Sequence, residues 1–318
     1  MNNKITLNAI TQAHERIRPY IHRTPIFTNQ TINDLAGASI FFKCENFQKI
    51  GAFKARGGLN AILQVAANKE GKAITTHSSG NHAQAVAFAA AIVGMPAYIV
   101  MPRNAPQVKK DAVKGYGAEI IECEPTLAAR ENGVLEVIER TGAVLVHPFD
   151  NDRVIAGQAT AAIELLEDAG YNGSFNTILA PVGGGGMLSG TALIVHYLSP
   201  KTRVIGCEPE GAADAVLSFK SGNIEKAPFL KTVADGLLTS LSERTLAIIR
   251  DHVSDILTVA DDEIIAAMRL VWERMKIIIE PSSAVAVAVV LKYRHLFAGQ
   301  KIGIIITGGN VDMGKLPF

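Results

Sequence analysis

The sequence predicts an α/β protein with two domains, each built on a mainly parallel, twisted sheet flanked by helices. Short apolar runs rich in Ile and Val alternate along the chain with longer stretches of helical character. The apolar runs do not alternate cleanly between apolar and polar residues, which indicates strands covered on both faces. The 318 residues also exceed what one core of ordinary size needs, so two domains are expected.

The individual elements follow from the same patterns. Segments with the composition of buried strands are 39–43, 73–76, 97–101, 118–122, 143–146, 177–180, 203–207, 255–259 and 303–307. Segments with helical character are 7–21, 81–93, 105–115, 127–140, 154–169, 187–198, 261–275 and 281–292. Segment 81–93 is rich in Ala, Val and Phe, which predicts a helix with little exposure to solvent.

Composition and charge exclude several classes of partner. The chain has 31 basic and 30 acidic residues, a formal net charge of +1, so we expect neither nucleic acid nor a membrane surface as partner. No apolar run is long enough to span a bilayer, and the first residues lack a signal-peptide pattern. The three cysteines lie far apart and form no CxxC pair, which favours a reducing, cytoplasmic location.

A run of four glycines, Gly183 to Gly186, follows the apolar strand TILAP and precedes a predicted helix. Glycines let backbone N–H groups close around a ligand, and the helix adds the partial positive charge of its N-terminus. Both features suit a phosphate. The order of glycines matches neither GxGxxG with a fitting acid nor GxxxxGKS, and a tight strand-to-helix turn is the alternative interpretation.

The segment SSGNHAQA, residues 78–85, follows another predicted strand and opens the apolar helix. The side chains of Ser78 and Ser79 and the amides of this loop would lie at the carboxyl end of a parallel strand, where ligands bind in open α/β sheets. A substrate carboxylate would suit this loop. A plain N-cap is the alternative for the serines, and Asn81 and His82 have turn-stabilising alternatives.

Lys54 lies between glycines in GAFKARGG, residues 51–58. It is either an ordinary solvated cation or a buried amine whose lowered pKa lets it attack a carbonyl. A reactive lysine, a phosphate loop and a carboxylate loop together describe an enzyme that uses pyridoxal phosphate on an amino acid.

Over nearly its whole length the chain resembles the fold type II pyridoxal phosphate enzymes, the tryptophan synthase β group. Within that group it is similar to the serine racemases and the short catabolic threonine dehydratases. The motifs that carry the resemblance are KCENFQKIGAFKARG, THSSGNHAQA, AYIVMP, VIAGQAT, PVGGGGMLSG, IGCEPEGAAD, VADGL, LVWERMKIIIEPSSAVAVA and TGGNVD.

The resemblance implies a role for each matching residue. Lys54 would form the Schiff base with the cofactor, and Thr307 would face the pyridine nitrogen. A hydroxyl at that place cannot hold the nitrogen protonated by ion pairing, so the ring would be a weaker electron sink. The remaining cofactor-binding residues would be Phe53, Asn81, Gly183, Gly184, Gly185, Gly186, Met187 and Glu280, and the substrate-binding residues would be Ser78, Ser79, Asn81 and His82. For Glu280 an ordinary helix start is the alternative, since Pro281 follows it.

The activity implied is racemisation of serine together with dehydration of serine or threonine. Lys54 would remove the Cα proton from one face of the substrate, and Ser79 would serve as acid or base on the opposite face. Reprotonation by Ser79 gives D-serine, whereas loss of the β-hydroxyl gives pyruvate and ammonia.

Other activities stay open. Phe149 stands where mammalian serine racemases have an asparagine, and in this the chain is closer to the dehydratases. A threo-3-hydroxyaspartate ammonia-lyase or a catabolic L-threonine dehydratase is therefore an alternative. From another class, a nucleotide-binding oxidoreductase would use Gly183–Gly186 for a pyrophosphate and would not need Lys54.

The resemblance also implies a metal site and partners. Glu208, Asp214 and the carbonyl of Ala212 would bind Mg²⁺, Mn²⁺ or Ca²⁺, with two solvated carboxylates as the alternative. A homodimer is expected. The large domain would comprise residues 1–66 and 151–318, and residues 67–150 would form a small mobile domain. An ATP site stays open at Lys49, Ile50, Tyr116, Lys276 and Asn310, which are otherwise ordinary surface or interface residues.

Overall fold

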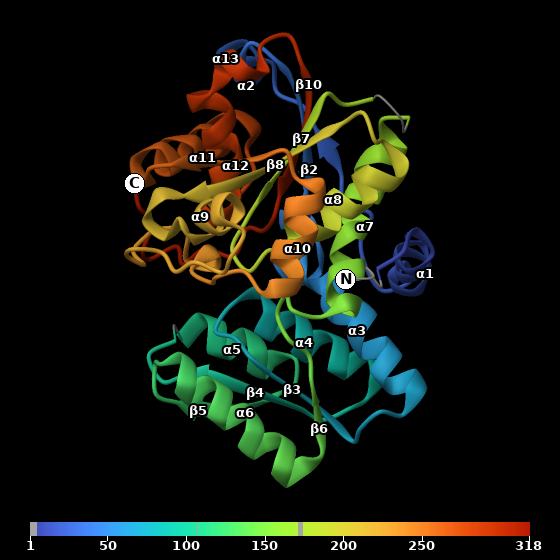
Figure 1. Cartoon of the computed structure of the whole chain (residues 1–318). Coiled ribbons are helices and arrows are strands. Elements are labelled where there is room, and N and C mark those ends of the chain that lie inside the picture. The colour runs from blue at the N-terminus through green and yellow to red at the C-terminus, as the bar shows by residue number, and fades with distance from the viewer. Residues whose placement is uncertain (1–4, 106, 171–173) are drawn as a thin grey trace.

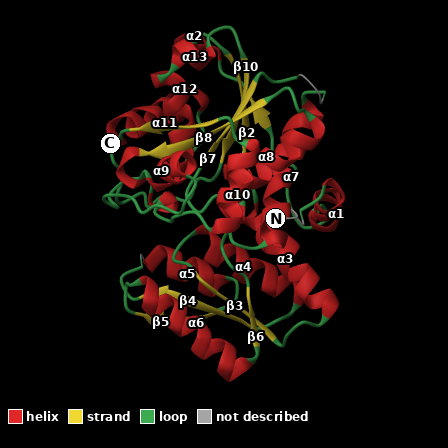
Figure 2. Ribbon diagram, in the orientation of Figure 1, coloured by secondary structure: helices red, strands yellow, loops and turns green. Residues whose placement is uncertain are grey.

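The structure is a computed structural model that describes residues 5–105, 107–170 and 174–318. Figure 1 shows two parts, an upper part that contains one sheet and a lower part that contains another. The described strands form one six-stranded and one four-stranded sheet. Figure 2 shows helices on both faces of the sheets, so the predicted α/β class with parallel sheets is confirmed.

The six-stranded sheet has the order β1-β2-β10-β7-β8-β9. All neighbours in it are parallel except β1 and β2, which pair antiparallel. Its strands are β1 (Ile26–Phe27), β2 (Ser39–Cys44), β7 (Thr177–Pro181), β8 (Arg203–Pro209), β9 (Asp255–Val259) and β10 (Lys301–Ile306). Every residue of β7 is buried, as expected for a strand with helices on both faces. The short strand β1 was not predicted, because two residues give no periodic pattern.

The four-stranded sheet is wholly parallel and has the order β5-β4-β3-β6. Its strands are β3 (Ala73–His77), β4 (Ala97–Pro102), β5 (Glu119–Cys123) and β6 (Ala143–Leu145). They come from one continuous stretch of chain, with α4 (Asn81–Val93), α5 (Gln107–Gly115) and α6 (Leu127–Thr141) between them. This arrangement supports the division into residues 67–150 and the rest, which stays a prediction.

The remaining helices flank the six-stranded sheet or join the two parts. They are α1 (Leu7–Ile17), α2 (Gln30–Ala36), α3 (Lys54–Asn68), α7 (Asp152–Asp168), α8 (Gly186–Leu198), α9 (Asp214–Ser221), α10 (Glu243–His252), α11 (Asp261–Met275), α12 (Pro281–Lys292) and α13 (Arg294–Phe297). Short 3-10 turns are η1 (Glu45–Phe47), η2 (Lys49–Gly51), η3 (Glu210–Ala212) and η4 (Asp235–Leu237). The sequence patterns did not predict α2, α3, α9, α10 and α13.

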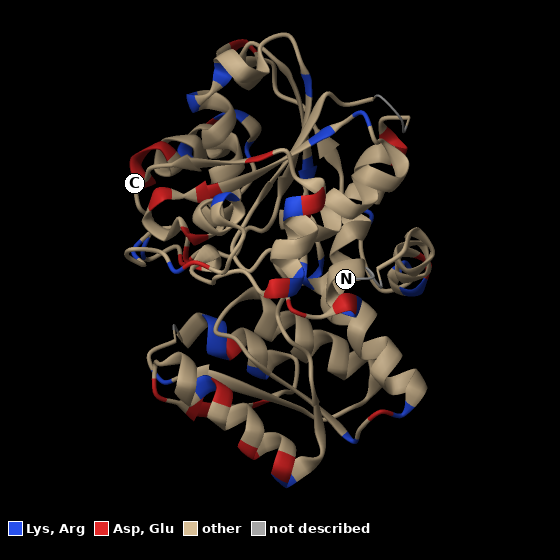
Figure 3. Ribbon diagram, in the orientation of Figure 1, with Lys and Arg blue, Asp and Glu red and all other residues tan. Residues whose placement is uncertain are grey.

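Charged residues of both signs are interspersed over the two parts (Figure 3). The near-zero formal charge is therefore not a sum of one basic part and one acidic part. Among the described residues, no helix combines the length and the apolar character that crossing a bilayer requires.

The fold brings the carboxyl ends of four strands to the junction of the two parts. The loop after β3 leads to Asn81, whose side chain bonds to Glu280 of the other part at 3.0 Å. The chain after β10 leads to Asn310, which bonds to the same Asn81 at 2.8 Å. The glycine run after β7 lies against Phe149, which follows β6. The candidate site is therefore at the junction, where ligands are expected in open α/β sheets.

Candidate active site

Lys54 is the first residue of α3 and its side chain is half-buried. The Nζ atom donates a hydrogen bond to the carbonyl oxygen of Pro148 at 2.9 Å and lies 5.1 Å from the centroid of the Phe53 ring. Burial lowers the pKa of the Lys54 amine to about 8, while the negative charge of Glu280 acts in the opposite direction. A larger unprotonated fraction near neutral pH makes this amine a better nucleophile than a surface lysine.

The backbone before Lys54 is fixed against the chain that follows β10. Phe53 N donates to Thr307 O at 2.9 Å, and Gly309 N donates to Gly51 O at 2.9 Å. Gly51 has a φ of +71°, and a Cβ there would lie 2.7 Å from Asn310 Oδ1. Only glycine therefore suits position 51.

Thr307 is buried at the end of β10, and its hydroxyl lies 2.9 Å from Ser283 Oγ. The Ser283 hydroxyl also donates to Gly308 O and accepts from Gly308 N, both at 2.8 Å. Ser283 thus holds the Thr307 hydroxyl in place. The sequence analysis did not single out Ser283, although it lies in the motif EPSSAVAVA.

The glycine run connects β7 to α8, which begins at Gly186. Gly185 has a φ of +86°, and a Cβ on it would lie 2.8 Å from side-chain atoms of Leu241 and Thr245. A Cβ on Gly184 would lie 2.2 Å from Phe149 Cδ1. Side chains in this loop would therefore meet their neighbours, and the bare backbone opens onto the N-terminus of a thirteen-residue helix. This arrangement fits a phosphate group. Met187, on the first turn of α8, is buried.

Ser78 and Ser79 lie in the loop between β3 and α4, and both are half-buried. Ser78 Oγ accepts a hydrogen bond from Gly80 N at 3.3 Å, as a turn-stabilising serine does. The Ser79 hydroxyl makes no hydrogen bond within the described part of the chain. Ser79 is therefore a half-buried hydroxyl that is free to meet a ligand.

Asn81, Glu280 and Asn310 form a chain of hydrogen bonds across the junction. Asn81 Nδ2 donates to both oxygens of Glu280, at 3.0 and 3.1 Å, and Asn310 Nδ2 donates to Asn81 Oδ1 at 2.8 Å. Burial raises the pKa of the Glu280 carboxyl to about 7, although the bond from Asn81 lowers it in part. The predicted contact of Asn81 and Glu280 with a cofactor stays a prediction, since these atoms bond to one another here.

His82 is 2% exposed and contacts the segment after β6 to which Lys54 bonds. Its Nε2 lies 2.9 Å from Val146 O, two residues before Pro148, whose carbonyl accepts the bond from Lys54. His82 Nδ1 is buried and has no hydrogen-bond partner among the described residues. Burial holds the pKa of His82 well below its usual range, so the imidazole is neutral. The predicted substrate contact of His82 stays a prediction. Pro148 was not singled out from the sequence, because no pattern marks a backbone carbonyl.

The predicted metal-binding residues lie on β8, in η3 and at the start of α9, and all of them are buried. Glu208 accepts hydrogen bonds from the amides of Ala215 at 2.7 Å and Val216 at 2.9 Å. Both carboxylate oxygens of Asp214 are buried and make no hydrogen bond of ordinary length and angle in the described chain, although the Ser240 side chain and the Leu241 backbone lie near enough to lower its pKa in part. Burial, with a smaller contribution from the nearby Asp214, raises the pKa of Glu208 to about 8, although the two amide bonds lower it in part.

These carboxylates are not solvated, so that alternative is wrong. Among the described residues, no three His, Cys, Asp or Glu side chains are grouped to hold a metal ion. The pair fits a hard cation only together with carbonyl and water oxygens, as Ca²⁺ and Mg²⁺ sites often have. Ala212 is buried in η3, and in the sequence it lies between Glu208 and Asp214.

Comparison with known proteins shows the family. The family described as pyridoxal-phosphate dependent enzyme matches residues 17–308. The chain is 50% identical over 313 residues to a beta-hydroxyaspartate dehydratase of Paracoccus denitrificans, covering 98% of each chain. It is 48% identical over 316 residues to a serine racemase of Dictyostelium discoideum, covering 98% of this chain and 97% of the other.

The fold gives the same result. The crystal structure of the serine racemase from Dictyostelium discoideum matches this structure with a TM-score of 0.91 and 48% identity, covering 97% of this chain and 99% of that one. The resemblance inferred from the motifs is therefore confirmed, and the half-buried lysine beside a glycine loop agrees with it. The chain belongs to the family of pyridoxal-phosphate dependent enzymes of fold type II.

Proposed function

We propose that this enzyme is a racemase and ammonia-lyase for small β-hydroxy amino acids. L-serine would be both racemised and dehydrated, and L-threonine would be dehydrated. The observation that carries the proposal is the half-buried Lys54 amine, which shares one junction with the glycine loop and with Ser79. The similarity to the serine racemase of Dictyostelium discoideum supports the reaction type. The oxidoreductase alternative is not retained, because the family match spans residues 17–308.

Bound pyridoxal phosphate supplies an aldehyde that takes up an amino group and a conjugated ring that accepts the electrons released at Cα. In our proposal the amides of Gly183–Gly186 hold the phosphate at the N-terminus of α8. The neutral Thr307 hydroxyl, held by Ser283, would face the ring nitrogen and would bring no negative charge to keep that nitrogen protonated. This favours brief charge development at Cα, as in proton transfer or loss of a β-hydroxyl.

Two groups would move the proton at Cα. The Lys54 amine takes it from one face, helped by the burial that lowers its pKa to about 8. Ser79 acts on the other face, and its half-buried, unbonded hydroxyl in the described chain supports that role. Because dehydration needs proton removal on one face only, Ser79 is required for racemisation and dispensable for dehydration.

We predict that Ser79→Ala lowers D-serine formation from L-serine by at least about 100-fold, the usual contribution of a general acid or base. Pyruvate formation should stay within about threefold of wild type. Chiral chromatography and a pyruvate assay on the same reactions measure both rates. Ser254→Ala, which changes an exposed serine far along the chain, is the matched control. Equal loss of both products in Ser79→Ala would contradict the two-face assignment.

A hydroxyaspartate ammonia-lyase is the second candidate. The 50% identity to the beta-hydroxyaspartate dehydratase of Paracoccus denitrificans favours it. Phe149, at which the sequence resembles the dehydratases more than the mammalian serine racemases, lies against Gly184 and favours it too. Comparing kcat/KM for L-serine, L-threonine and the isomers of 3-hydroxyaspartate separates the two proposals. A preference for hydroxyaspartate of more than about tenfold over L-serine would establish the second candidate and remove the first.

We also propose that Glu208, Asp214 and the Ala212 carbonyl bind a divalent cation such as Mg²⁺, Mn²⁺ or Ca²⁺. Two neighbouring buried carboxylates, one of them without a hydrogen bond of ordinary geometry in the described chain, support this proposal. A cation there would offset the cost of burying both negative charges. Its role would be structural or activating, because the electron sink lies elsewhere.

Thermal unfolding tests the metal site. With the cation at 100 times its Kd, stabilisation of about 2.7 kcal/mol is expected, and EDTA should remove it. Asp214→Asn should abolish the response to Mg²⁺ or Ca²⁺, whereas Asp34→Asn, an exposed carboxylate on α2, should retain it. A melting temperature that is indifferent to both cation and EDTA would contradict the site.

Assembly remains a further proposal, argued from the resemblance. We expect a homodimer, and light scattering of the purified enzyme measures its mass. The ATP site at Lys49, Ile50, Tyr116, Lys276 and Asn310 stays open. Asn310 already bonds to the Ile50 carbonyl and to Asn81, so nucleotide bound there would meet the hydrogen-bond chain that reaches Glu280.

A further inference from the structure

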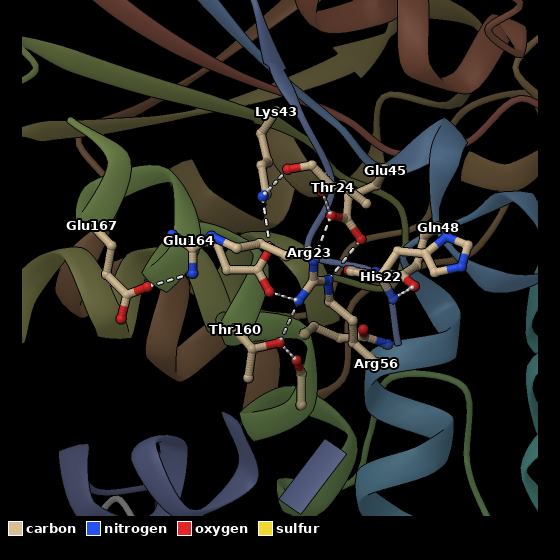
Figure 4. Close-up of polar contacts among 12 residues, drawn as sticks. His22, Arg23, Thr24, Lys43, Glu45, Gln48, Arg56, Thr160, Glu164 and Glu167 are labelled. Atoms are coloured by element: carbon tan, nitrogen blue, oxygen red, sulfur yellow. Dashed lines mark hydrogen bonds and ion pairs between the residues drawn. The ribbon is translucent and has the colours of Figure 1, made fainter. Parts of the chain in front are cut away.

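Four charged side chains that the proposed mechanism does not use are buried together under α3 (Figure 4). Lys43, Glu45, Arg56 and Glu164 are each 2% exposed or less. They come from β2, η1, α3 and α7, and their formal charges cancel. We call them the charge cluster.

Arg56 is the centre of the charge cluster, and each of its five N–H groups has an acceptor. Its Nε and Nη2 donate to the two oxygens of Glu45 at 2.7 and 2.8 Å. Its Nη1 and Nη2 donate to the two oxygens of Glu164, both at 2.8 Å, and Nη1 also donates to Thr160 Oγ1 at 3.1 Å. Lys43 completes the set, since its Nζ donates to Glu164 at 2.6 Å. Only a guanidinium has this planar set of donors, so a lysine at position 56 cannot reproduce it.

Stability is a weak explanation for this arrangement. Removing four charges from water costs several kcal/mol per ion, and well-packed apolar residues often stabilise such a site as well or better. A buried network with all its hydrogen bonds made does fix one geometry. The charge cluster therefore holds η1, α3 and α7 in one fixed arrangement.

The charge cluster joins the two ends of segment 45–56, which contains Lys54. Glu45 and Arg56 stand at the two ends of this segment, and a two-pronged ion pair joins them. Lys54 lies two residues before Arg56, in the first turn of α3. A shift of the Arg56 side chain relative to Glu45 and Glu164 would therefore act on Lys54 across only two residues of one helical turn.

The same contacts set the distance from α3 to the glycine loop. A Cβ on Gly157 of α7 would lie 2.6 Å from Gly57 Cα, and a Cβ on Gly190 of α8 would lie 2.7 Å from Ala159 N. Helices α3, α7 and α8 thus touch backbone to backbone, and α8 begins at the last glycine of the loop. Arg56 ties α3 to α7 at Glu164 and Thr160, beside these contacts.

We propose that Arg56 is a positioning residue, which through Glu45 and Glu164 sets the place of the Lys54 amine relative to the glycine loop. The inference rests on the proposed function of Lys54 and goes beyond it. Catalysis by a held amine depends on placement within about 1 Å, and such an error can cost about 100-fold in rate. The binding of a free amino acid does not depend on that placement to the same extent.

The variant Arg56→Lys keeps the positive charge and removes the planar set of guanidinium donors. Arg153→Lys is the matched control, because Arg153 of α7 forms a two-pronged ion pair with Glu70, at 2.7 and 2.6 Å, near the other end of α3. Both variants are prepared as holoenzyme. The measurements are kcat and KM for the β-hydroxy amino acid that wild type turns over fastest, and the visible circular dichroism of the bound cofactor divided by its absorbance.

For Arg56→Lys we expect kcat to fall at least tenfold, KM to stay within threefold, and the normalised visible dichroism to fall by half or more. Arg153→Lys should keep all three within twofold. If Arg56→Lys yields no folded enzyme, Glu45→Gln, which keeps the side-chain size, is measured by the same criteria.

Unchanged kcat and dichroism in a variant with a lowered melting temperature would overturn the proposal, since the charge cluster would then serve stability alone. Failure of both variants to fold would overturn it for the same reason. A wild-type holoenzyme without a visible lysine-bound cofactor would overturn the proposed function of Lys54 together with this inference. Equal behaviour of wild type and Arg56→Lys would overturn only the positioning role.

Discussion

At the scale of single residues, burial is the main influence on the ionisable groups of the site. It lowers the pKa of Lys54 to about 8 and raises the pKa of Glu280 to about 7. The two groups also act on each other, since the Glu280 charge favours the protonated form of Lys54. The same physical cause therefore prepares an amine that can lose its proton and a carboxyl that can keep one.

Glu280 gives a pH-dependent stability that can be measured on the protein freed of cofactor and divalent ions. Its pKa is raised above the ordinary value of 4.5, so the folded state binds more protons than the unfolded state between about pH 4.5 and 7. Its contribution is present below pH 4.5 and is lost as the pH rises through 7. At about 1.4 kcal/mol per pKa unit, the loss is about 3 kcal/mol.

The free energy of unfolding should therefore fall less steeply between pH 5 and 7 in Glu280→Gln than in wild type, and the difference in slope should correspond to about one bound proton. Urea titration at each pH measures this slope. Part of the slope should remain, because the pKa of Glu208 is raised in the same way. Glu136→Gln, an exposed glutamate on α6, should keep the wild-type slope. An unchanged slope in Glu280→Gln would contradict the raised pKa.

At the scale of elements, the site depends on how closely α3, α7 and α8 approach. Gly157 has its would-be Cβ 2.6 Å from both Arg56 O and Gly57 Cα, and backbone atoms cannot move aside as a flexible side chain can. The helices therefore meet at glycines, as close helix crossings require.

Gly157→Ala should destabilise the protein by about 1–3 kcal/mol, the usual cost of overpacking. It should also lower kcat, because α3 would move away from the glycine loop. Gly115→Ala, at the end of α5 with nothing within 4 Å of the added Cβ, should be neutral or slightly stabilising. Denaturant titration and steady-state kinetics measure both variants; a Gly157→Ala enzyme as stable and active as wild type would show that the helices can separate without harm.

The sequence patterns predicted some elements well and missed others for physical reasons. Helices 81–93, 261–275 and 281–292 have the predicted bounds. The first and the third are almost continuously apolar, and the second is amphipathic with an acidic first turn. Helix α3 was not predicted because Gly57 and Gly58 lower helix propensity by about 1 kcal/mol each. Gly57 lies against α7, about a hundred residues away, and Gly58 lies against Ala85 of α4, and no local pattern reports either contact.

At the scale of the whole molecule, the junction of the two parts is the site. Its general place could be predicted, because glycine- and serine-rich loops at the carboxyl ends of parallel strands meet there. The pairs that build it could not, since Lys54 with Pro148 and Asn81 with Glu280 join distant segments. The charge cluster escaped prediction for the same reason: its members are spread over residues 43–164.

An ion pair also joins the two parts at the edge of the junction. Lys109 of α5 bonds to Asp235 of η4 at 2.5 Å, and Asp235 is exposed. If the part that contains the four-stranded sheet closes over substrate, Lys109→Met should raise KM up to about fivefold with little change in kcat. The reason is that exposed ion pairs contribute up to about 1 kcal/mol. Arg103→Met removes the exposed ion pair of Arg103 with Glu124, which lies wholly within the part that contains the four-stranded sheet, and should leave KM unchanged. A KM that is the same in both variants would show that the pair has no part in closure.

The proposed function requires Lys54 to be the residue that binds the cofactor covalently. Reduction of the holoenzyme with borohydride, followed by digestion and mass spectrometry, measures this directly. We expect a single pyridoxyl-phosphate adduct on the peptide that contains Lys54, and no adduct in Lys54→Ala. An adduct on a different lysine, or none in a wild-type enzyme that is active, would contradict it.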